Sequence, residues 1–198
     1  MEHNKSIVVL DFGGQYAHLI ARRVRQCGVY SEIKDAETSA EELKGAAGII
    51  LSGGPQSVYD PKSPQGDPAL FDLGIPVLGI CYGLHWMTKA LGGEVSEGKT
   101  KEYGKTKIHI EDSEWSEADG IPQDLTVWMS HGDEVSKLPD GFTRVATSDA
   151  CANAGFTHKE KKLFAVQFHP EVTHTEYGEQ MLANFVKQCD ADPWSIKS

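Results

Sequence analysis

Short apolar runs alternate with a helical pattern in the first half of the chain, and this alternation constrains the fold more than any other sequence feature. Residues 16–27 carry apolar side chains at helical spacing, and Gly28 follows as a stop signal. The order of strand, helix and strand predicts a parallel sheet covered by helices on both faces. The expected strands of this sheet are residues 7–10, 30–34, 48–51 and 77–80.

Beyond Gly92 and Gly93, the chain changes to short strand-like pieces joined by turns, which favours antiparallel pairing. These pieces are residues 105–110, 126–129, 144–148 and 164–168. A last amphipathic helix is expected at residues 176–188, with its apolar side chains facing inward. The sequence therefore predicts a single α/β domain over residues 1–198. Its fold is an open, mostly parallel central sheet flanked by helices, with an added smaller antiparallel sheet.

The charge balance and the hydropathy exclude several classes of protein. The 198 residues include 19 Lys and Arg against 29 Asp and Glu, which gives a formal net charge of −10. This charge argues against nucleic-acid binding, which needs clustered basic side chains. No apolar run approaches the ~18 residues of a membrane span, and the N-terminus lacks the zones of a secretory signal. We therefore expect a cytoplasmic protein that binds neither nucleic acid nor membrane.

The cysteines are few and far apart, without a Cys-x-x-Cys pair or the spacing of metal ligands. This pattern indicates neither a disulfide framework nor a zinc site, and we expect no metal. At least one thiol is therefore free for chemistry. The four cysteines are Cys27, Cys81, Cys151 and Cys189.

Cys81 lies in the segment PVLGICYGLHWMTKALGG, where a buried strand ends and a helix begins. A strand, a sharp turn and a helix form a nucleophile elbow, in which Gly79 and Gly83 leave room for a strained turn. The helix N-terminus favours the thiolate, and the N–H of Tyr82 can face a developing oxyanion. The alternative is that Cys81 is a small core residue, because free cysteine is often buried. The Gly-x-Cys-x-Gly frame favours the nucleophile.

A base for this thiol is available in the segment AVQFHPEV, near the end of another expected strand. The residue before Pro170 avoids the helical region, so the chain is extended and His169 and Glu171 project to the same side. An imidazole held by a carboxylate can take the thiol proton, which gives a triad in the order Cys, His, Glu. Taken alone, this segment is equally compatible with a strand-end histidine beside a surface glutamate.

Gly53 and Gly54 follow the expected strand at residues 48–51, in the segment SGGP. Glycines adopt backbone dihedrals that other residues resist, so they can point N–H groups into a site. The N–H of Gly54 is then a candidate second oxyanion donor beside that of Tyr82. Ligands of open α/β sheets bind beyond the carboxyl ends of the strands, so we expect this loop and the Cys81 turn to share one site. On its own, SGGP is more often an ordinary turn or an anion-binding loop.

Five segments together resemble the class I, or triad, glutamine amidotransferases over almost the whole chain, and within them the glutaminase part of GMP synthetase. These segments are DFGGQYAHLIARRVR, LSGGPQSVY, LGICYG, VWMSHGDEV and QFHPEVTHT. The resemblance implies a flavodoxin-like fold and a γ-glutamyl thioester on Cys81, with His169 shuttling protons and Glu171 orienting His169. It also implies that the oxyanion lies between the N–H groups of Gly54 and Tyr82.

The same resemblance implies the substrate and the partner. Glutamine is hydrolysed, and an ATP pyrophosphatase (synthetase) subunit or domain uses the ammonia to convert XMP to GMP. ATP and Mg²⁺ act in that partner, so no cofactor is implied for this chain, whether it is a subunit or an excised domain. The residues implied in substrate binding are Gly53, His85, Ser130, His131, Gly132 and Asp133. A polar turn is the alternative for the SHGD segment, and His174 and Glu176 are implied contacts of the synthetase.

His85 departs from the family, whose pattern Cys-x-Gly-x-Gln has a glutamine that helps to hold the substrate. A neutral imidazole offers one donor and one acceptor in a different geometry. Losing one oriented hydrogen bond costs about 1–3 kcal/mol when a buried partner is left unpaired. Two roles of His85 stay open: accommodation through a water, or a positive charge near the substrate carboxylate.

Three hypotheses about function follow from these observations. The first is a glutaminase that depends on a partner, and the second is a weakly active or non-catalytic regulatory subunit, motivated by His85. The third is a cysteine hydrolase acting on another γ-glutamyl compound. For the first, we also expect the Gly53–Gly54 peptide or the segment 56–66 to be mispositioned until the partner docks, because ammonia would otherwise be wasted.

Overall fold

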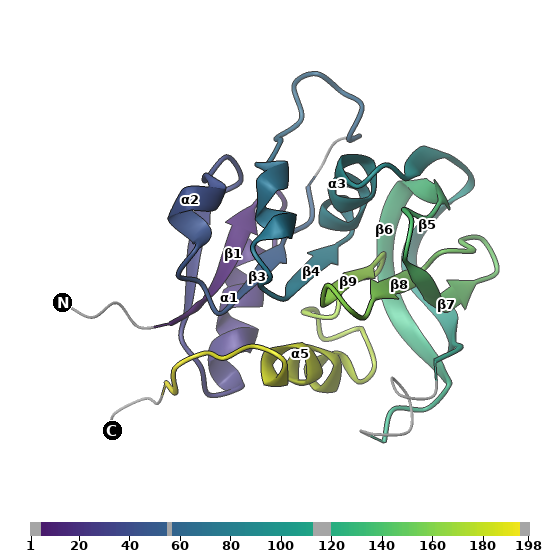
Figure 1. Ribbon diagram of the computed structural model, residues 1–198. Coiled ribbons are helices and arrows are strands. Elements are labelled where there is room, and N and C mark those ends of the chain that lie inside the picture. The colour runs from purple at the N-terminus through teal and green to yellow at the C-terminus, as the bar shows by residue number, and fades with distance from the viewer. Residues whose placement is uncertain (1–4, 55–56, 113–119, 195–198) are drawn as a thin grey trace.

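The structure of the chain is a computed structural model that describes residues 5–54, 57–112 and 120–194 (Figure 1). Its strands are β1 Ile7–Asp11, β2 Ser31–Asp35, β3 Gly48–Leu51, β4 Val77–Ile80, β5 Glu94–Ile110, β6 Asp124–Lys137, β7 Thr143–Ser148, β8 Gly155–His158 and β9 Leu163–Val166. Its helices are α1 Ala17–Gln26, α2 Ala40–Leu43, α3 Tyr82–Ala90, α5 Gly178–Lys187 and the 3₁₀ helix η1 Pro68–Asp72.

The described strands form one sheet in the order β2-β1-β3-β4-β9-β8-β7-β5-β6. From β2 to β9 the neighbouring strands pair in parallel, and from β9 to β6 they pair antiparallel. Strand β9 therefore belongs to both parts: it is parallel to β4 on one side and antiparallel to β8 on the other. The predicted α/β class with a mostly parallel centre is confirmed for the region that holds β1 to β4.

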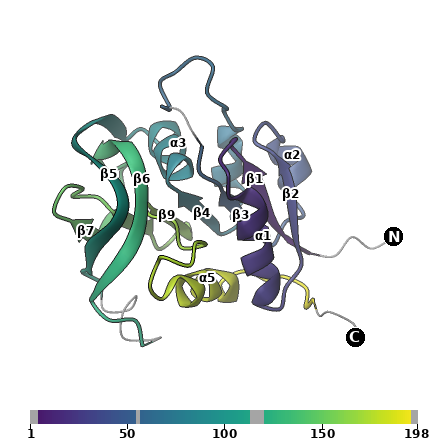
Figure 2. The same ribbon diagram turned by 180° about the vertical axis from the view of Figure 1, so that it is seen from behind.

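The parallel strands bury both of their faces, so alternate residues of one strand enter two different hydrophobic cores. In β1, Ile7 and Val9 pack in the core that includes α1 and α5. Val8 and Leu10 pack in the other core, with side chains of α2, η1 and α3. Figure 2 shows α1 and α5 side by side on one face of the sheet. The sheet is thus held from both sides, and this fixes the positions of its strand ends.

The structure differs from the sequence prediction in the second half. The antiparallel strands continue the central sheet and do not form a separate smaller one. Strands β5 and β6 extend well beyond the predicted residues 105–110 and 126–129, and β8 was not predicted. The full length of these strands could not be predicted, because β5 contains many charged residues and buries only a few of its side chains. Few buried positions give a weak alternating pattern.

The segment SHGD was expected to follow a strand, and this was wrong. Ser130, His131, Gly132 and Asp133 all lie inside β6, and all but Gly132 pair with residues of β5. A break in the β5–β6 register between Glu97 and Glu102 lies opposite this segment. The last helix is confirmed, since the inward side chains of α5 are buried. Among the described residues, none of the helices has the length and hydrophobicity that a transmembrane span needs.

Candidate active site

Three neighbouring parallel strands, β3, β4 and β9, end at the same edge of the sheet. Ser52 and Gly53 follow β3, Cys81 follows β4, and His169 lies three residues beyond β9. This agrees with the expectation that the loops after β3 and β4 share one site. The edge is the position at which open α/β sheets bind ligands.

The backbone of Cys81 is in a strained conformation at the junction of β4 and α3. Its φ is 51° and its ψ is −109°, a region that residues with a side chain rarely adopt. The turn is held by a hydrogen bond from the Cys81 N–H to the Val166 carbonyl (2.9 Å). A side chain at Gly83 would overlap with the Leu51 carbonyl, and one at Gly79 would lie 2.9 Å from the Gly83 carbonyl. The glycines therefore permit the elbow, as the sequence predicted.

The sulfur of Cys81 faces groups from two other strands. The thiol donates to the Ser130 carbonyl of β6 at 3.5 Å, and Nε2 of Gln167 lies 3.8 Å from the sulfur. The His169 imidazole also shares a hydrogen bond with Cys81. Gln167 and His169 lie in the bend directly after β9, and both reach Cys81 from there.

His169 and Glu171 form a buried pair next to this thiol. Nδ1 of His169 lies 2.7 Å from Oε1 of Glu171, and both side chains are almost completely shielded from solvent. Burial alone lowers the pKa of His169. The hydrogen bonds with Cys81 and Glu171, together with their negative charges, outweigh burial and raise this pKa to about 10. At neutral pH the imidazole therefore carries a proton that it can give to a leaving group.

Further contacts fix the pair in place. The hydroxyl of Thr175 donates to the His169 carbonyl (2.6 Å) and accepts from the Trp128 N–H (2.9 Å). The guanidinium of Arg23, on α1, donates to the Glu171 carbonyl (3.0 Å). Tyr16 meets the His169 ring edge-on, with centroids 5.6 Å apart. The orientation of His169 is thus set from three elements, which is what a proton shuttle needs.

The loop after β3 has a fixed peptide plane. The Gly53 carbonyl accepts hydrogen bonds from the Gly14 N–H (3.1 Å) and from the Ser52 hydroxyl (3.0 Å). The Gly54 N–H belongs to the same peptide and points away from that carbonyl. Tyr82 is the first residue of α3, so its N–H has no acceptor within the helix. These N–H groups remain the two candidate oxyanion donors.

A pocket of about 390 Å³ opens over these groups. Its walls come from the loop after β1, the loop after β3, the elbow, β6 and the strand end that carries His169. The lining residues are Gly13, Gly14, Gln15, Tyr16, Gly53, Gly54, Cys81, Trp128, Ser130 and His169. The pocket is large enough for an amino-acid side chain to reach the sulfur.

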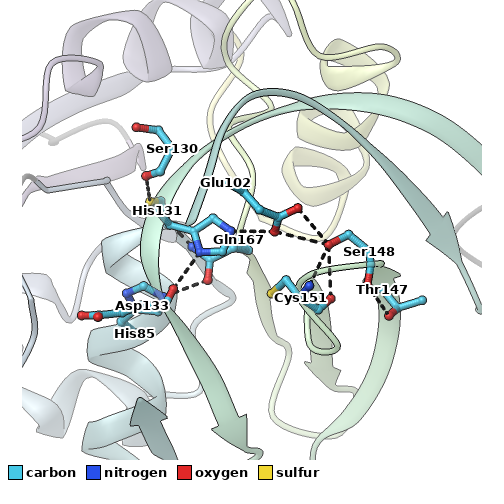
Figure 3. A network of polar contacts seen from close by, with 10 residues as sticks. His85, Glu102, Ser130, His131, Asp133, Thr147, Ser148, Cys151 and Gln167 are labelled. Atoms are coloured by element: carbon cyan, nitrogen blue, oxygen red, sulfur yellow. Dashed lines mark hydrogen bonds and ion pairs between the residues drawn. The ribbon is translucent and has the colours of Figure 1, made fainter. Parts of the chain in front are cut away.

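The six residues predicted to bind substrate divide into two groups. Gly53 and Ser130 line the pocket, whereas His85, His131, Gly132 and Asp133 do not. His85 is only 4% exposed, and its Nε2 lies 2.8 Å from Oε1 of Gln167 (Figure 3). Burial lowers the pKa of His85 to about 4, although the hydrogen bond with Gln167 acts in the opposite direction. A positive charge on His85 near the substrate, one of the two roles left open, is therefore wrong.

His131 is also buried behind the pocket wall. Its Nδ1 donates to the Asp133 carbonyl (2.7 Å), and its Nε2 lies 3.0 Å from Oε1 of Glu102 (Figure 3). The Ser148 hydroxyl donates to the same carboxylate. The ligand atoms of Glu102, His131 and Cys151 lie within 4.8 Å of one another, close enough to share a metal ion. The hydrogen bonds of Glu102 also connect β5 with β6 and β7.

Sequence reasoning missed Gln167 and the residues of the loop after β1. Gln167 precedes His169 by two positions, so the alternation that pairs His169 with Glu171 could have found it. His174 and Glu176, the expected partner contacts, are both exposed. His174 stacks on Trp128, and Glu176 accepts a hydrogen bond from the Thr126 N–H.

Comparison with known proteins matches residues 8–189 to a family model described as glutamine amidotransferase class-I. The chain belongs to this family. The recognition made from the sequence motifs is thereby confirmed, and so is the fold class that it implied.

Similar proteins narrow the comparison to one branch of the family. The chain is 49% identical to GMP synthase [glutamine-hydrolyzing] of Staphylococcus carnosus over 201 residues and 53% identical to that of Bacillus pumilus over 199. These alignments cover 100% and 98% of this chain, but it spans only 39% of the length of either relative.

Solved structures give the same picture. The crystal structure of a GMP synthase subunit from Thermoplasma acidophilum shares 36% identity, with a TM-score of 0.81 and 95% of each chain covered. A glutamine amidotransferase from Thermotoga maritima, at 23% identity, has a TM-score of 0.67 with 94% of this chain and 96% of that chain covered, and supports the fold alone.

Proposed function

We propose that this chain hydrolyses glutamine to glutamate and ammonia. The observation that carries the proposal is the arrangement of Cys81, His169 and Glu171. Cys81 lies at a strained turn of the backbone and shares a hydrogen bond with His169, while Glu171 holds Nδ1 of that imidazole. A thiol, a base and a group that orients the base form the arrangement of a cysteine nucleophile. The relatives, which are glutamine-hydrolysing GMP synthases, support glutamine as the substrate.

The reaction proceeds through a thioester. His169 holds the thiol proton, and the Cys81 sulfur attacks the side-chain amide carbon of glutamine. The carbonyl oxygen becomes an oxyanion, which accepts hydrogen bonds from the N–H groups of Gly54 and Tyr82. His169 then donates its proton to the amide nitrogen as the C–N bond breaks, and ammonia leaves. In the second half, His169 takes a proton from water, which attacks the γ-glutamyl thioester and releases glutamate and the thiol.

The ammonia is used by a second protein unit. We propose an ATP pyrophosphatase subunit or domain of GMP synthetase, which aminates XMP to GMP with ATP and Mg²⁺ bound in that unit. This is supported by the relatives, because 39% of their length corresponds to this chain and the remainder is available for the synthetase. Glutamine is thus the substrate that this chain itself binds in the proposed reaction. We place this reaction in the cytoplasm.

The alternative of a non-catalytic regulatory subunit is not favoured. That hypothesis depended on His85 replacing a glutamine that holds the substrate. His85 does not line the pocket, and the buried pair of His169 and Glu171 next to Cys81 supports a catalytic role for the chain.

Ammonia release from glutamine tests the proposal. The chain is assayed alone and with a GMP synthetase ATP pyrophosphatase subunit supplied with XMP, ATP and Mg²⁺. We expect turnover that rises with the loaded partner and is abolished in Cys81→Ala, while Cys27→Ser, a change in another free thiol, stays close to wild type. Turnover in Cys81→Ala near the wild-type rate would refute the mechanism.

A further inference from the structure

His85 and Gln167 are two buried polar side chains that the proposed reaction does not use. Gln167 is completely buried and His85 nearly so, at the interface of α3 with the end of β9. Their side chains are joined by the contact from Nε2 to Oε1 at 2.8 Å, and the other end of the Gln167 amide lies 3.8 Å from the Cys81 sulfur. A continuous path therefore runs from His85 through Gln167 to the nucleophile.

The direction of this path follows from which groups can donate. The Gln167 oxygen can only accept, so Nε2 of His85 must carry the hydrogen. The amide nitrogen is then turned towards the sulfur, where its two N–H groups can donate to a thiolate. If His85 carried its hydrogen on Nδ1 instead, the amide would gain by rotating, and it would present its oxygen to the sulfur. The tautomer of His85 thus selects which end of Gln167 meets Cys81.

The surroundings keep His85 neutral. It is buried on α3, and the titratable side chains that act on its charge are His131 and Asp133, both from β6, with opposite effects on its pKa. Cys81 is faced by His169 with Glu171 behind it, by Gln167, and by the Ser130 carbonyl. Among the described residues, Gln167 is thus a neutral side-chain donor 3.8 Å from the sulfur, in addition to His169.

We propose that His85 is a positioning residue, which as a neutral Nε2–H imidazole orients the Gln167 amide so that it donates to the Cys81 thiolate. The inference rests on the proposed function, in which that thiolate is the nucleophile. It gives the departure from the family pattern a role, because the histidine acts behind the nucleophile and does not contact the substrate.

The pH dependence of Cys81 alkylation tests this role without any substrate. The full chain is treated with iodoacetamide between pH 5 and 10, and Cys81 is followed by peptide mass spectrometry. The other thiols do not interfere, because burial raises their pKa values, to about 12 for Cys151 and Cys189. Gln167→Leu and His85→Leu are each expected to move the alkylation midpoint up by about one pH unit, since a hydrogen bond to the thiolate is lost.

Two further variants separate positioning from packing. His85→Gln should restore most of the midpoint, because its amide can donate to Oε1 of Gln167. Thr88→Val alters a buried hydroxyl one turn further along α3 and should leave the midpoint unchanged. In the glutaminase assay, His85→Leu should lower kcat about tenfold at pH values below the alkylation midpoint. We expect kcat to recover at higher pH and KM to stay unchanged.

An unchanged midpoint in folded Gln167→Leu and His85→Leu would overturn the proposal. If either variant fails to fold, the tautomer of His85 in the wild-type chain decides, measured by ¹⁵N NMR of labelled histidine. The Nε2–H form supports the path, and the Nδ1–H form overturns it. Failure of the His85 proposal can be distinguished from failure of the proposed glutaminase function. If the proposed function fails, ammonia release persists in Cys81→Ala.

Discussion

Two buried imidazoles act on Cys81, His169 directly and His85 through Gln167, and they differ in the groups that each of them faces. Both are almost fully buried, and burial lowers the pKa of each. For His169, the interactions with Cys81 and with the Glu171 carboxylate outweigh burial and raise the pKa to about 10. For His85, the hydrogen bond with the neutral amide of Gln167 also raises the pKa but does not outweigh burial, so the pKa is lowered to about 4. The strength of the partner interactions therefore decides whether a buried imidazole is a proton carrier or a fixed neutral donor.

The largest expected effect comes from giving His169 the kind of partner that His85 has. In Glu171→Gln the carboxylate becomes an amide of the same shape, so the imidazolium loses its counter-charge and its tautomer is no longer fixed. We expect kcat for ammonia release to fall about 10³- to 10⁴-fold, with the fold preserved. The matched control is Glu37→Gln, an exposed glutamate between β2 and α2. Activity of Glu171→Gln within a few-fold of wild type would contradict the role of the carboxylate.

The dependence of stability on pH sharpens the contrast between the two histidines. The pKa of His85 is lowered from 6.5 to about 4, so between these values the unfolded chain binds a proton that the folded chain does not. Its contribution is present above pH 6.5 and is lost as the pH falls, by about 3 kcal/mol at pH 4. For His169 the sign is opposite: its contribution is complete below pH 6.5 and is lost as the pH rises through about 10.

Urea unfolding of the wild type and His85→Gln, at several pH values from 4 to 7.5, isolates the first of these effects. Because the variant has no imidazole at this position, the wild type should lose about 3 kcal/mol relative to it over this range. A difference in unfolding free energy that stays constant with pH would show that His85 is not held neutral by the fold.

The smallest effect is expected from the support of His169. Thr175→Val removes the hydroxyl that donates to the His169 carbonyl and accepts from the Trp128 N–H. We expect a loss of about 1–3 kcal/mol in unfolding free energy, because a buried N–H is left without its acceptor. Thermal or urea unfolding measures it. No loss of stability would mean that this hydroxyl does not fix the strand end.

The parallel region could be predicted from sequence more fully than the antiparallel one. Strands β3 and β4 have the predicted bounds, because both faces are buried and the apolar runs are continuous. Strands β5 and β6 form a long ribbon with many exposed side chains, so only their most apolar parts were predicted. The register of such a ribbon depends on pairing between distant residues, which local patterns do not contain.

The residues of the site also differ in how far they could be predicted from the sequence. Cys81, His169 and Glu171 lie at the ends of predictable strands, and the structure brings them together as expected. The placement of His85 was not predictable, because its partner Gln167 lies 82 residues away in the sequence. The same holds for His131, whose contact with Glu102 depends on the β5–β6 pairing.

One pH titration of both histidines tests the central claim most directly. Histidine-labelled protein is followed by ¹⁵N NMR from pH 4.5 to 9.5, with His85 and His169 assigned through the backbone. The account predicts that His169 is still doubly protonated at pH 8 and that His85 is already neutral at pH 5.5. If both imidazoles instead titrate together near pH 6.5, the two sides of Cys81 do not differ in charge and the account fails.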